Sequence, residues 1–309
     1  MSLRIAFAGS PAVAVPSLDA LLASQHEVVA VVSREDSPVG RRGALAPTPV
    51  AARAEEAGLP LVRADRLDAA ATEAVLATRP DLGVIVAYGG LVREPLLSGP
   101  RLGWINLHFS LLPRWRGAAP VQHAILAGDR ETGVTVFQLV PELDAGEVYA
   151  RLTEPIGRFQ TSGALLDRLA RLGSGVLVDV VDALADGTAR SEPQRGEPSY
   201  AGKLSAADGV LDWSLPAAAI DARIRAVTPE PGASTTLGGQ RFKVLEARPA
   251  RDAVPVPPGR VELHERRVLV GTGDEPIELV RVTPPGKAQM SAADWLRGRP
   301  RGEATMLGA

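Results

Sequence analysis

Asn106 and His108 are the two residues of this chain whose types and spacing best suit catalysis. They stand two positions apart at the end of an apolar run, residues 104–108, that predicts a short buried strand, so both side chains project from one face. A loop punctuated by proline and glycine follows at once, as at the carboxyl end of a strand in an open α/β sheet, where such folds place their ligands. An amide can donate a hydrogen bond to an oxygen that becomes negative, and an imidazole can donate one or move a proton near neutral pH. The pair therefore suits acyl chemistry.

The spacing alone leaves a structural role open. A histidine at a strand end is often a satisfied core or surface residue, and an asparagine there is often a turn former. The chain has only four histidines, of which we expect His123 and His264 to be structural or exposed. These two and His108 have no metal-ligand spacing, and cysteine is absent, so we predict no metal site and no disulfide.

The first two thirds of the chain alternate between apolar runs and helical patterns. This alternation predicts an α/β fold, a Rossmann-like and mostly parallel sheet with helices on both faces. No Gly-x-Gly-x-x-Gly follows the first run, so dinucleotide binding is not indicated. The expected strands are residues 3–8, 28–32, 82–87, 104–108 and 134–139. The first expected helix follows the first strand and ends near residue 24, and the others are residues 50–57, 69–77, 121–127 and 165–184.

The pattern changes after residue 187. A polar stretch with two prolines and a glycine predicts a linker over residues 188–205. Short strands at close spacing then predict a small C-terminal β-barrel of the OB-like kind over residues 206–309, while residues 1–187 form the first domain. The expected strands are 241–247, 260–263, 267–270 and 277–283, flanked by helices at 216–226 and 291–297, the last with Asp294 at its third position.

The composition predicts a soluble globular protein without a membrane partner. The chain of 309 residues is 45% hydrophobic and 23% charged, and no apolar run reaches membrane-spanning length. The lack of cysteine fits a cytoplasmic location. The net charge of −2 carries no general nucleic-acid signal, so any RNA binding must use local patches.

Residues 106–120 carry the most specific motif, Asn-x-His-x-Ser-Leu-Leu-Pro-x-x-Arg-Gly-x-x-Pro. It resembles the signature of the 10-formyltetrahydrofolate-dependent formyltransferases, and its full form is similar to that of the members that act on methionyl-tRNA. Shorter motifs follow the family in the right order, so the resemblance covers nearly the whole chain. They are residues 7–11, 87–89, 143–146, 200–204 and 212–213.

The resemblance implies formyl transfer from 10-formyltetrahydrofolate to the α-amino group of the initiator methionyl-tRNA, without a metal. That reaction passes through a tetrahedral intermediate, so it needs an oxyanion stabiliser and groups that move protons. Asn106 and His108 suit the first role. The match to the family's Leu-Asp-Thr-Gly motif, in which Ala145 replaces the usual threonine, assigns Asp144 as the carboxylate that accepts a proton and orients the imidazole. On its residues alone, an aspartate before small residues is more often a turn former.

The family's folate site maps onto two segments of this chain. The resemblance implies that main-chain groups in these segments bind the pterin edge while leucine side chains flank the ring. Without the resemblance, ordinary loop packing explains the same residues. The implied folate residues are Ser110, Leu111, Leu112, Pro113, Val86, Tyr88, Gly89 and Leu91.

Residues 34–49 form a long loop for which the sequence predicts neither a helix nor a strand. A loop of this length inside a compact domain favours a functional role. In the resembled enzymes a basic loop at this place contacts the acceptor stem of the tRNA, which implies tRNA contacts for Arg34, Arg41 and Arg42. The alternative is a solvated loop, because two neighbouring acidic residues offset part of its charge.

Two rival functions stay open from the sequence. One is a formyltransferase that acts on a sugar-nucleotide amine or on glycinamide ribonucleotide, since such enzymes share the three catalytic residues. The motifs at 200–204 and 212–213 favour the tRNA substrate. The other is a non-catalytic RNA-binding module on this fold, against which Asn106, His108 and Asp144 argue. We expect a monomer.

Overall fold

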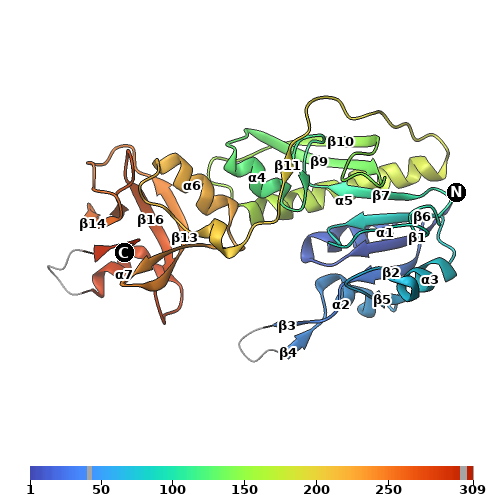
Figure 1. Ribbon diagram of the computed structural model, residues 1–309, viewed down its shortest axis with the longest axis horizontal. Helices are drawn as coiled ribbons and strands as arrows, with labels where there is room; N and C mark the ends of the chain where they lie inside the picture. Colours follow the sequence, from blue (N-terminus) through green and yellow to red (C-terminus); the bar gives the residue numbers. More distant parts are fainter. Residues whose placement is uncertain (40–43, 300–304, 309) are drawn as a thin grey trace. The chain divides into compact units, whose positions relative to one another are not determined.

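The computed structural model describes residues 1–39, 44–299 and 305–308 (Figure 1). The chain forms two compact units that interleave along the sequence. Unit 1 comprises residues 1–120, 131–155 and 166–201, and unit 2 comprises residues 121–130, 156–165 and 202–309. None of the helices in the described ranges is both long and apolar enough to cross a membrane.

Unit 1 is built on a mixed sheet in the spatial order β10-β9-β7-β6-β1-β2-β5. The five strands from β7 to β5 are parallel, and β9 and β10 extend the sheet in antiparallel fashion beside β7. The strands are β1 Arg4–Gly9, β2 Glu27–Ser33, β5 Leu61–Arg63, β6 Leu82–Val86, β7 Trp104–His108, β9 Glu131–Gln138 and β10 Val148–Pro155. The order reverses between β1 and β6, the kind of place where open α/β sheets bind ligands beyond the carboxyl ends of the strands.

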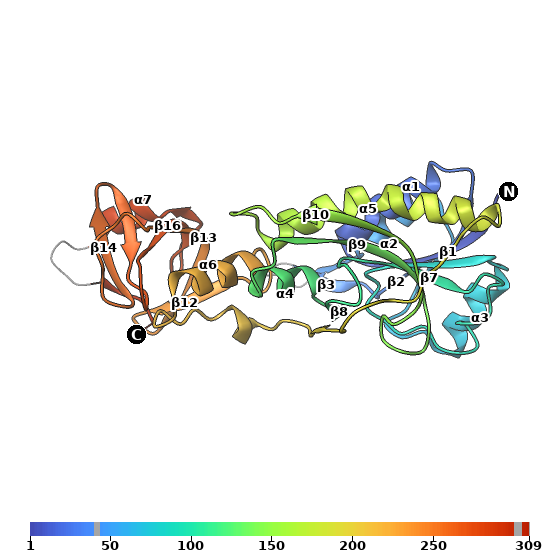
Figure 2. The same cartoon turned by 90° about the horizontal axis from the view of Figure 1, so that it is seen from above.

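Helices cover both faces of this sheet (Figure 2), with α1 and α5 on one face and α3 on the other. Coverage on both faces explains why every residue of β6 is buried and why the strands read as continuous apolar runs. The helices of unit 1 are α1 Val15–Leu22, α2 Pro49–Glu56, α3 Ala69–Ala77 and most of α5 Ser162–Ala185, with a 3₁₀ turn at Ala12–Ala14. Helix α4, Pro120–Leu126, belongs to unit 2 except for its first residue. The Rossmann-like, mostly parallel sheet predicted from the sequence is confirmed.

Three parts of unit 1 differ from the sequence prediction. The two edge strands were not predicted: β10 pairs with β9, and β5 pairs in parallel with β2. The loop at residues 34–49, expected to lack structure, contains a short antiparallel pair, β3 Ser37–Val39 and β4 Ala44–Ala46. That prediction was wrong because a hairpin this short has no periodicity to read.

Unit 2 contains an antiparallel sheet in the order β12-β13-β16-β15-β14-β18, with β17 paired to β16, consistent with the predicted small barrel. Its core centres on Trp213, Phe242 and Trp295, and the last two rings lie 4.7 Å apart. The strands are β12 Ala233–Leu237, β13 Gln240–Pro249, β14 Arg260–His264, β15 Arg267–Val270, β16 Ile277–Thr283, β17 Met290–Ser291 and β18 Thr305–Met306. The helices are α6 Ala217–Ala226 and α7 Ala292–Arg297, with a 3₁₀ turn at Ala206–Gly209. Ser291 caps α7 by accepting a hydrogen bond from the amide of Asp294, as the sequence suggested.

The stretch expected to be a linker makes specific contacts with unit 1 as far as residue 201. Glu192 forms an isolated antiparallel bridge with Val148. Strand β11, Tyr200–Ala201, then pairs in parallel with β8, Arg116–Gly117. The second of these pairings fixes the loop that follows β7.

Candidate active site

Strand β7 presents Asn106 and His108 on the same face of the unit 1 sheet. Between them, Leu107 points to the opposite face, where its methyl groups lie against the backbone of Gly173 in α5. In the register of the sheet, Asn106 lies opposite Phe137, and His108 lies opposite Thr135, both on β9. The alternation predicted from the sequence therefore holds, and it places the amide and the imidazole at the carboxyl end of β7.

The His108 imidazole is buried, with 7% of its side chain exposed. Its Nε2 lies 2.8 Å from the carbonyl oxygen of Trp115. Because a carbonyl can only accept, Nε2 carries the hydrogen, and in the neutral ring Nδ1 is left as an acceptor. Nδ1 lies 3.9 Å from Oδ2 of Asp144, and the ring meets Phe137 edge-on.

Burial lowers the pKa of His108 below its ordinary value, whereas the negative charge of Asp144 and the Trp115 carbonyl act in the opposite direction. A lowered pKa keeps the imidazole neutral near pH 7 and available to accept a proton at Nδ1. The site thus pairs a neutral base with a carboxylate that can stabilise the imidazolium once it forms.

Asp144 is held at the tip of the β9–β10 loop. Its side chain is 10% exposed, and Oδ2 accepts a 2.7 Å hydrogen bond from the amide of Gly117. Gly117 has φ +113°, and a Cβ there would lie 2.8 Å from the carbonyl oxygen of Ala201, so the pairing of β8 with β11 requires glycine. This pairing aims the Gly117 amide at the carboxylate.

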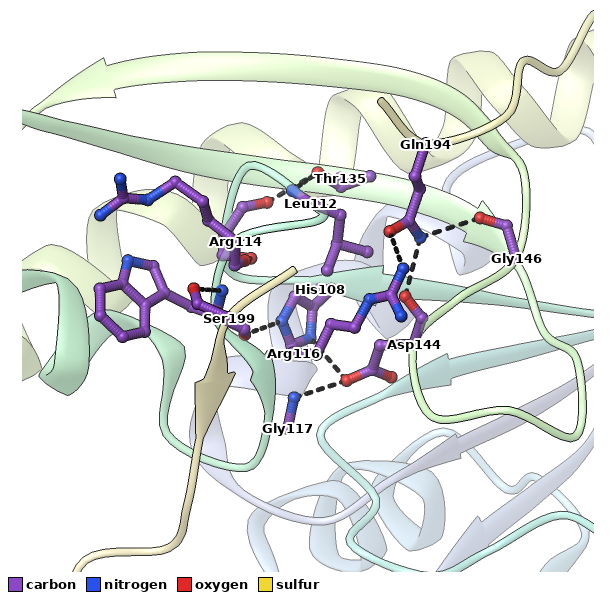
Figure 3. A network of polar contacts seen from close by, with 12 residues as sticks. His108, Leu112, Arg114, Arg116, Gly117, Thr135, Asp144, Gly146, Gln194 and Ser199 are labelled. Carbon is purple, nitrogen blue, oxygen red and sulfur yellow. Dashed lines mark hydrogen bonds and ion pairs between the residues drawn. The ribbon is translucent and has the colours of Figure 1, made fainter. Parts of the chain in front are cut away.

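Gln194 connects the two loops of the site (Figure 3). Its Nε2 donates to the carbonyl oxygens of Asp144 at 2.7 Å and Gly146 at 2.9 Å, and its Oε1 accepts from Nη2 of Arg116 at 2.7 Å. Sequence reasoning missed Gln194 because it lies in a polar stretch without periodicity. Arg116 belongs to the long motif of residues 106–120, but that motif does not indicate its contact with Gln194.

The Ser110–Pro113 turn is folded around Thr135 of β9. Thr135 Oγ1 donates to the carbonyl of Ser110 at 2.7 Å and accepts from the amide of Leu112 at 3.2 Å, while Ser110 Oγ donates to the carbonyl of Arg114 at 2.6 Å. A cavity of about 590 Å³ borders this turn, and it is lined by Leu111, Leu112, Pro113, Arg114, Trp115, Arg195, Gly196, Glu197, Pro198 and Ser199. The turn is thus rigid and has open space beside it.

The second predicted folate segment lies at the end of β6, the parallel neighbour of β7. Val86 is buried, and Leu91 is 64% exposed. The Tyr88 ring belongs to the core, and its hydroxyl donates to the carbonyl of Ala64, so only its main chain is available to a ligand. Gly89 follows with φ +82°.

The predicted tRNA-binding arginines are only partly within the described residues. Arg34 forms an ion pair with Asp65 at 3.0 Å, and its amide donates to Ser10. Arg41 and Arg42 lie outside the described residues. Within those residues, no three histidine, aspartate or glutamate side chains come together as a set of metal ligands.

Comparison with known proteins gives matches over both units. Residues 3–181 match the formyl transferase family, and residues 203–300 match the formyl transferase C-terminal domain. The chain is 60% identical over 304 residues to "Methionyl-tRNA formyltransferase" of Leifsonia xyli subsp. xyli, covering 98% of this chain and 100% of that one. It is 54% identical over 296 residues to the protein of the same name from Clavibacter sepedonicus, covering 96% and 97% of the two chains.

A solved structure has a similar fold at low sequence identity. HypX from Aquifex aeolicus, in complex with tetrahydrofolic acid, superposes with a TM-score of 0.63 at 17% identity. The match covers 99% of this chain and 51% of that one. At this level of identity the likeness concerns the fold alone.

Proposed function

The chain belongs to the formyl transferase family, and from this premise we propose that it transfers the formyl group of 10-formyltetrahydrofolate to the α-amino group of initiator methionyl-tRNA. The observation that carries the proposal is the 60% identity to a methionyl-tRNA formyltransferase over 98% of this chain and all of the relative. Matches to both the N-terminal and the C-terminal family domains support it. On this proposal the product serves translation initiation in the cytoplasm, and the protein acts as a monomer.

The three residues at the end of β7 and in the β9–β10 loop have distinct roles in this proposal. The Asn106 amide donates a hydrogen bond to the formyl oxygen as it becomes negative. The His108–Asp144 pair takes the proton that the amine loses as its nitrogen bonds to the formyl carbon. The same pair returns that proton to the folate nitrogen when the old carbon–nitrogen bond breaks. An α-amino group with a pKa of about 7.7–8.0 is partly neutral at pH 7, so a weak base suffices.

The folate co-substrate is assigned to the carboxyl ends of β6 and β7. The Ser110–Pro113 turn offers fixed main-chain groups, because Thr135 holds it from both sides. Val86, Gly89 and Leu91 complete the proposed site, together with the main chain of Tyr88. This placement agrees with the crevice beyond the strand ends, where open α/β sheets bind ligands.

The tRNA is assigned to unit 2 and to the loop at residues 34–49. Replacing Arg41 and Arg42 together with alanine tests the loop. We expect weaker tRNA binding and a flatter plot of log affinity against log salt, because fewer counterions are released on binding. An unchanged slope would show that the loop is only a solvated surface.

One assay separates the proposed function from its rivals. The purified protein is offered 10-formyltetrahydrofolate with methionyl-tRNA, a sugar-nucleotide amine or glycinamide ribonucleotide, side by side. We expect formylation of methionyl-tRNA only. Preference for either small amine would reject the tRNA substrate, and binding of tRNA without any formylation would indicate a non-catalytic RNA-binding module.

A further inference from the structure

Asp144 has a left-handed backbone conformation, which aspartate adopts more readily than most residues but still less readily than an extended or right-handed one. Its φ is +47°, in the left-handed region where the Cβ of a non-glycine residue is crowded. Such a conformation persists only where surrounding contacts over-determine it. The contacts that hold this turn therefore decide where the Asp144 carboxylate lies.

Gln194 makes those contacts through its whole carboxamide. The two hydrogens on Nε2 bond the carbonyl oxygens of Asp144 and Gly146, at 2.7 and 2.9 Å, on either side of the turn. A Cβ on Gly146 would overlap the carbonyl oxygen of Gln138, so the turn is also pressed against β9. The Gln194 amide thus closes the open side of a tightly packed turn.

Arg116 ties Gln194 to the loop that follows His108. Its Nη2 donates to Gln194 Oε1 at 2.7 Å, whereas its buried Nε has no hydrogen-bond partner among the described residues. The guanidinium is therefore oriented through Gln194. The next residue, Gly117, donates its amide to Asp144 Oδ2, so Asp144, Gly117, Arg116 and Gln194 form a closed ring of contacts.

We propose that Gln194 is a positioning residue for Asp144, whose carboxamide fixes the strained turn and so keeps the carboxylate beside Nδ1 of His108. The inference rests on the proposed function for its kinetic consequence, but not for its geometry. The imidazole is faced by the Asp144 carboxylate, the Trp115 carbonyl and the edge of Phe137. Without Gln194, the backbone of the turn relaxes toward a right-handed or extended conformation. The Asp144 carboxylate then moves away from the His108 imidazole.

Two substitutions separate hydrogen bonding from packing. Gln194→Met keeps the length of the side chain and loses all three hydrogen bonds. Gln194→Glu can still accept from Arg116 but cannot donate to the two carbonyls. Gln25→Met is the control, since it makes the same substitution away from the site and removes the hydrogen bond that Nε2 of Gln25 donates to Oδ1 of Asp182 at 2.7 Å.

We expect both Gln194 variants to lower kcat with methionyl-tRNA roughly tenfold to a hundredfold, with KM changed much less, because a misplacement of about 1 Å at a reacting group costs on that order. A second readout does not depend on turnover. In an NMR titration, the pKa of the His108 imidazole should fall in Gln194→Met, because the withdrawn carboxylate stabilises the imidazolium less. Gln25→Met should leave both values near those of the parent.

The proposal is overturned if Gln194→Met folds and keeps both kcat and the His108 pKa of the parent. It is also overturned if Gln194→Met fails to fold while Gln25→Met folds, because Gln194 would then be a stability residue. A Gln194→Glu variant with parental kcat would show that only the contact with Arg116 matters. It would reject the proposed role of the hydrogen bonds to the carbonyls of Asp144 and Gly146. If the parent itself does not formylate methionyl-tRNA, the proposed function fails, and the NMR titration still decides the position of Asp144.

Discussion

The two units hold their polar groups in opposite ways. In unit 1, His108 and Asp144 are 7% and 10% exposed, and each bonds a main-chain group that fixes its direction. In unit 2, a cavity of about 350 Å³ is lined by four arginines, by two aspartates, of which Asp221 pairs with Arg225 at 2.8 Å, and by Phe159, which is 53% exposed. Guanidinium groups of Arg158 and Arg248 lie over the Phe159 ring at 5.1 and 5.8 Å.

This difference separates a site suited to chemistry from a surface suited to binding. Buried groups in a low dielectric act strongly on a nearby reacting atom, and they need not reorganise during the reaction. Exposed cations are screened by salt and attract a polyanion without fixing its geometry. Substitutions in unit 1 should therefore change the rate, and substitutions around the unit 2 cavity should change the salt-dependent affinity for tRNA.

The sharpest test of this division is Asp144→Asn. The amide keeps the shape and can still accept from Gly117, but it can neither carry the charge that stabilises an imidazolium nor accept a proton as a base. We expect a loss of about 10²–10⁴ in the single-turnover rate, the range of general acid–base catalysis, with unchanged tRNA affinity. A folded variant with the parental rate would remove Asp144 from the chemistry.

Asn106→Ala should have the next largest effect. Loss of one donor to a developing oxyanion costs about 2.7–4 kcal/mol, which corresponds to a hundredfold to a thousandfold in rate. Stopped-flow or quenched single-turnover measurements at saturating substrates isolate the chemical step. A rate within a few-fold of the parent would show that the formyl oxygen is stabilised elsewhere.

The buried imidazole also predicts a pH dependence of stability. Burial lowers the pKa of His108 in the folded state below the unfolded value of about 6.5. As the pH falls through that value, the unfolded chain therefore binds more protons at this residue than the folded chain does. The free energy of unfolding contributed by this residue therefore falls as the pH drops through that value. We expect the Tm difference between pH 7 and pH 5.5 to be smaller in His108→Gln than in the parent. Equal differences would contradict the lowered pKa.

The sequence was most informative about unit 1 where the structure is periodic. The alternation at residues 104–108 was enough to place Asn106 and His108 on one face, because the side-chain direction in a strand depends only on parity. The position of Asp144 was implied by a family motif, since a turn has no comparable period.

Gln194 and the strand pair Ser37–Val39 and Ala44–Ala46 could not be predicted from the sequence, for different reasons. Gln194 acts through contacts to residues 48 and 50 positions earlier in the chain, which no local pattern encodes. The hairpin has three residues on each side, too few for an alternation to stand out. Conversely, no local pattern could predict the arginine-lined cavity of unit 2, because Arg130 and Arg158 come from segments far in the sequence from Arg225 and Arg251.

The smallest expected effect lies at that cavity, where a substitution tests whether unit 2 serves tRNA binding. Replacing Arg130 and Arg158 together with alanine should weaken tRNA binding several-fold while kcat stays near the parental value. If both guanidinium groups contact phosphates of duplex tRNA, the slope of log affinity against log salt should decrease in magnitude by about 0.9 per lost contact. The pair Arg130→Lys and Arg158→Lys is the matched control, because it keeps both charges and should keep the slope. An alanine pair that lowers kcat without changing the slope would mean that unit 2 assists the chemistry, and the division between a reacting unit and a binding unit would then fail.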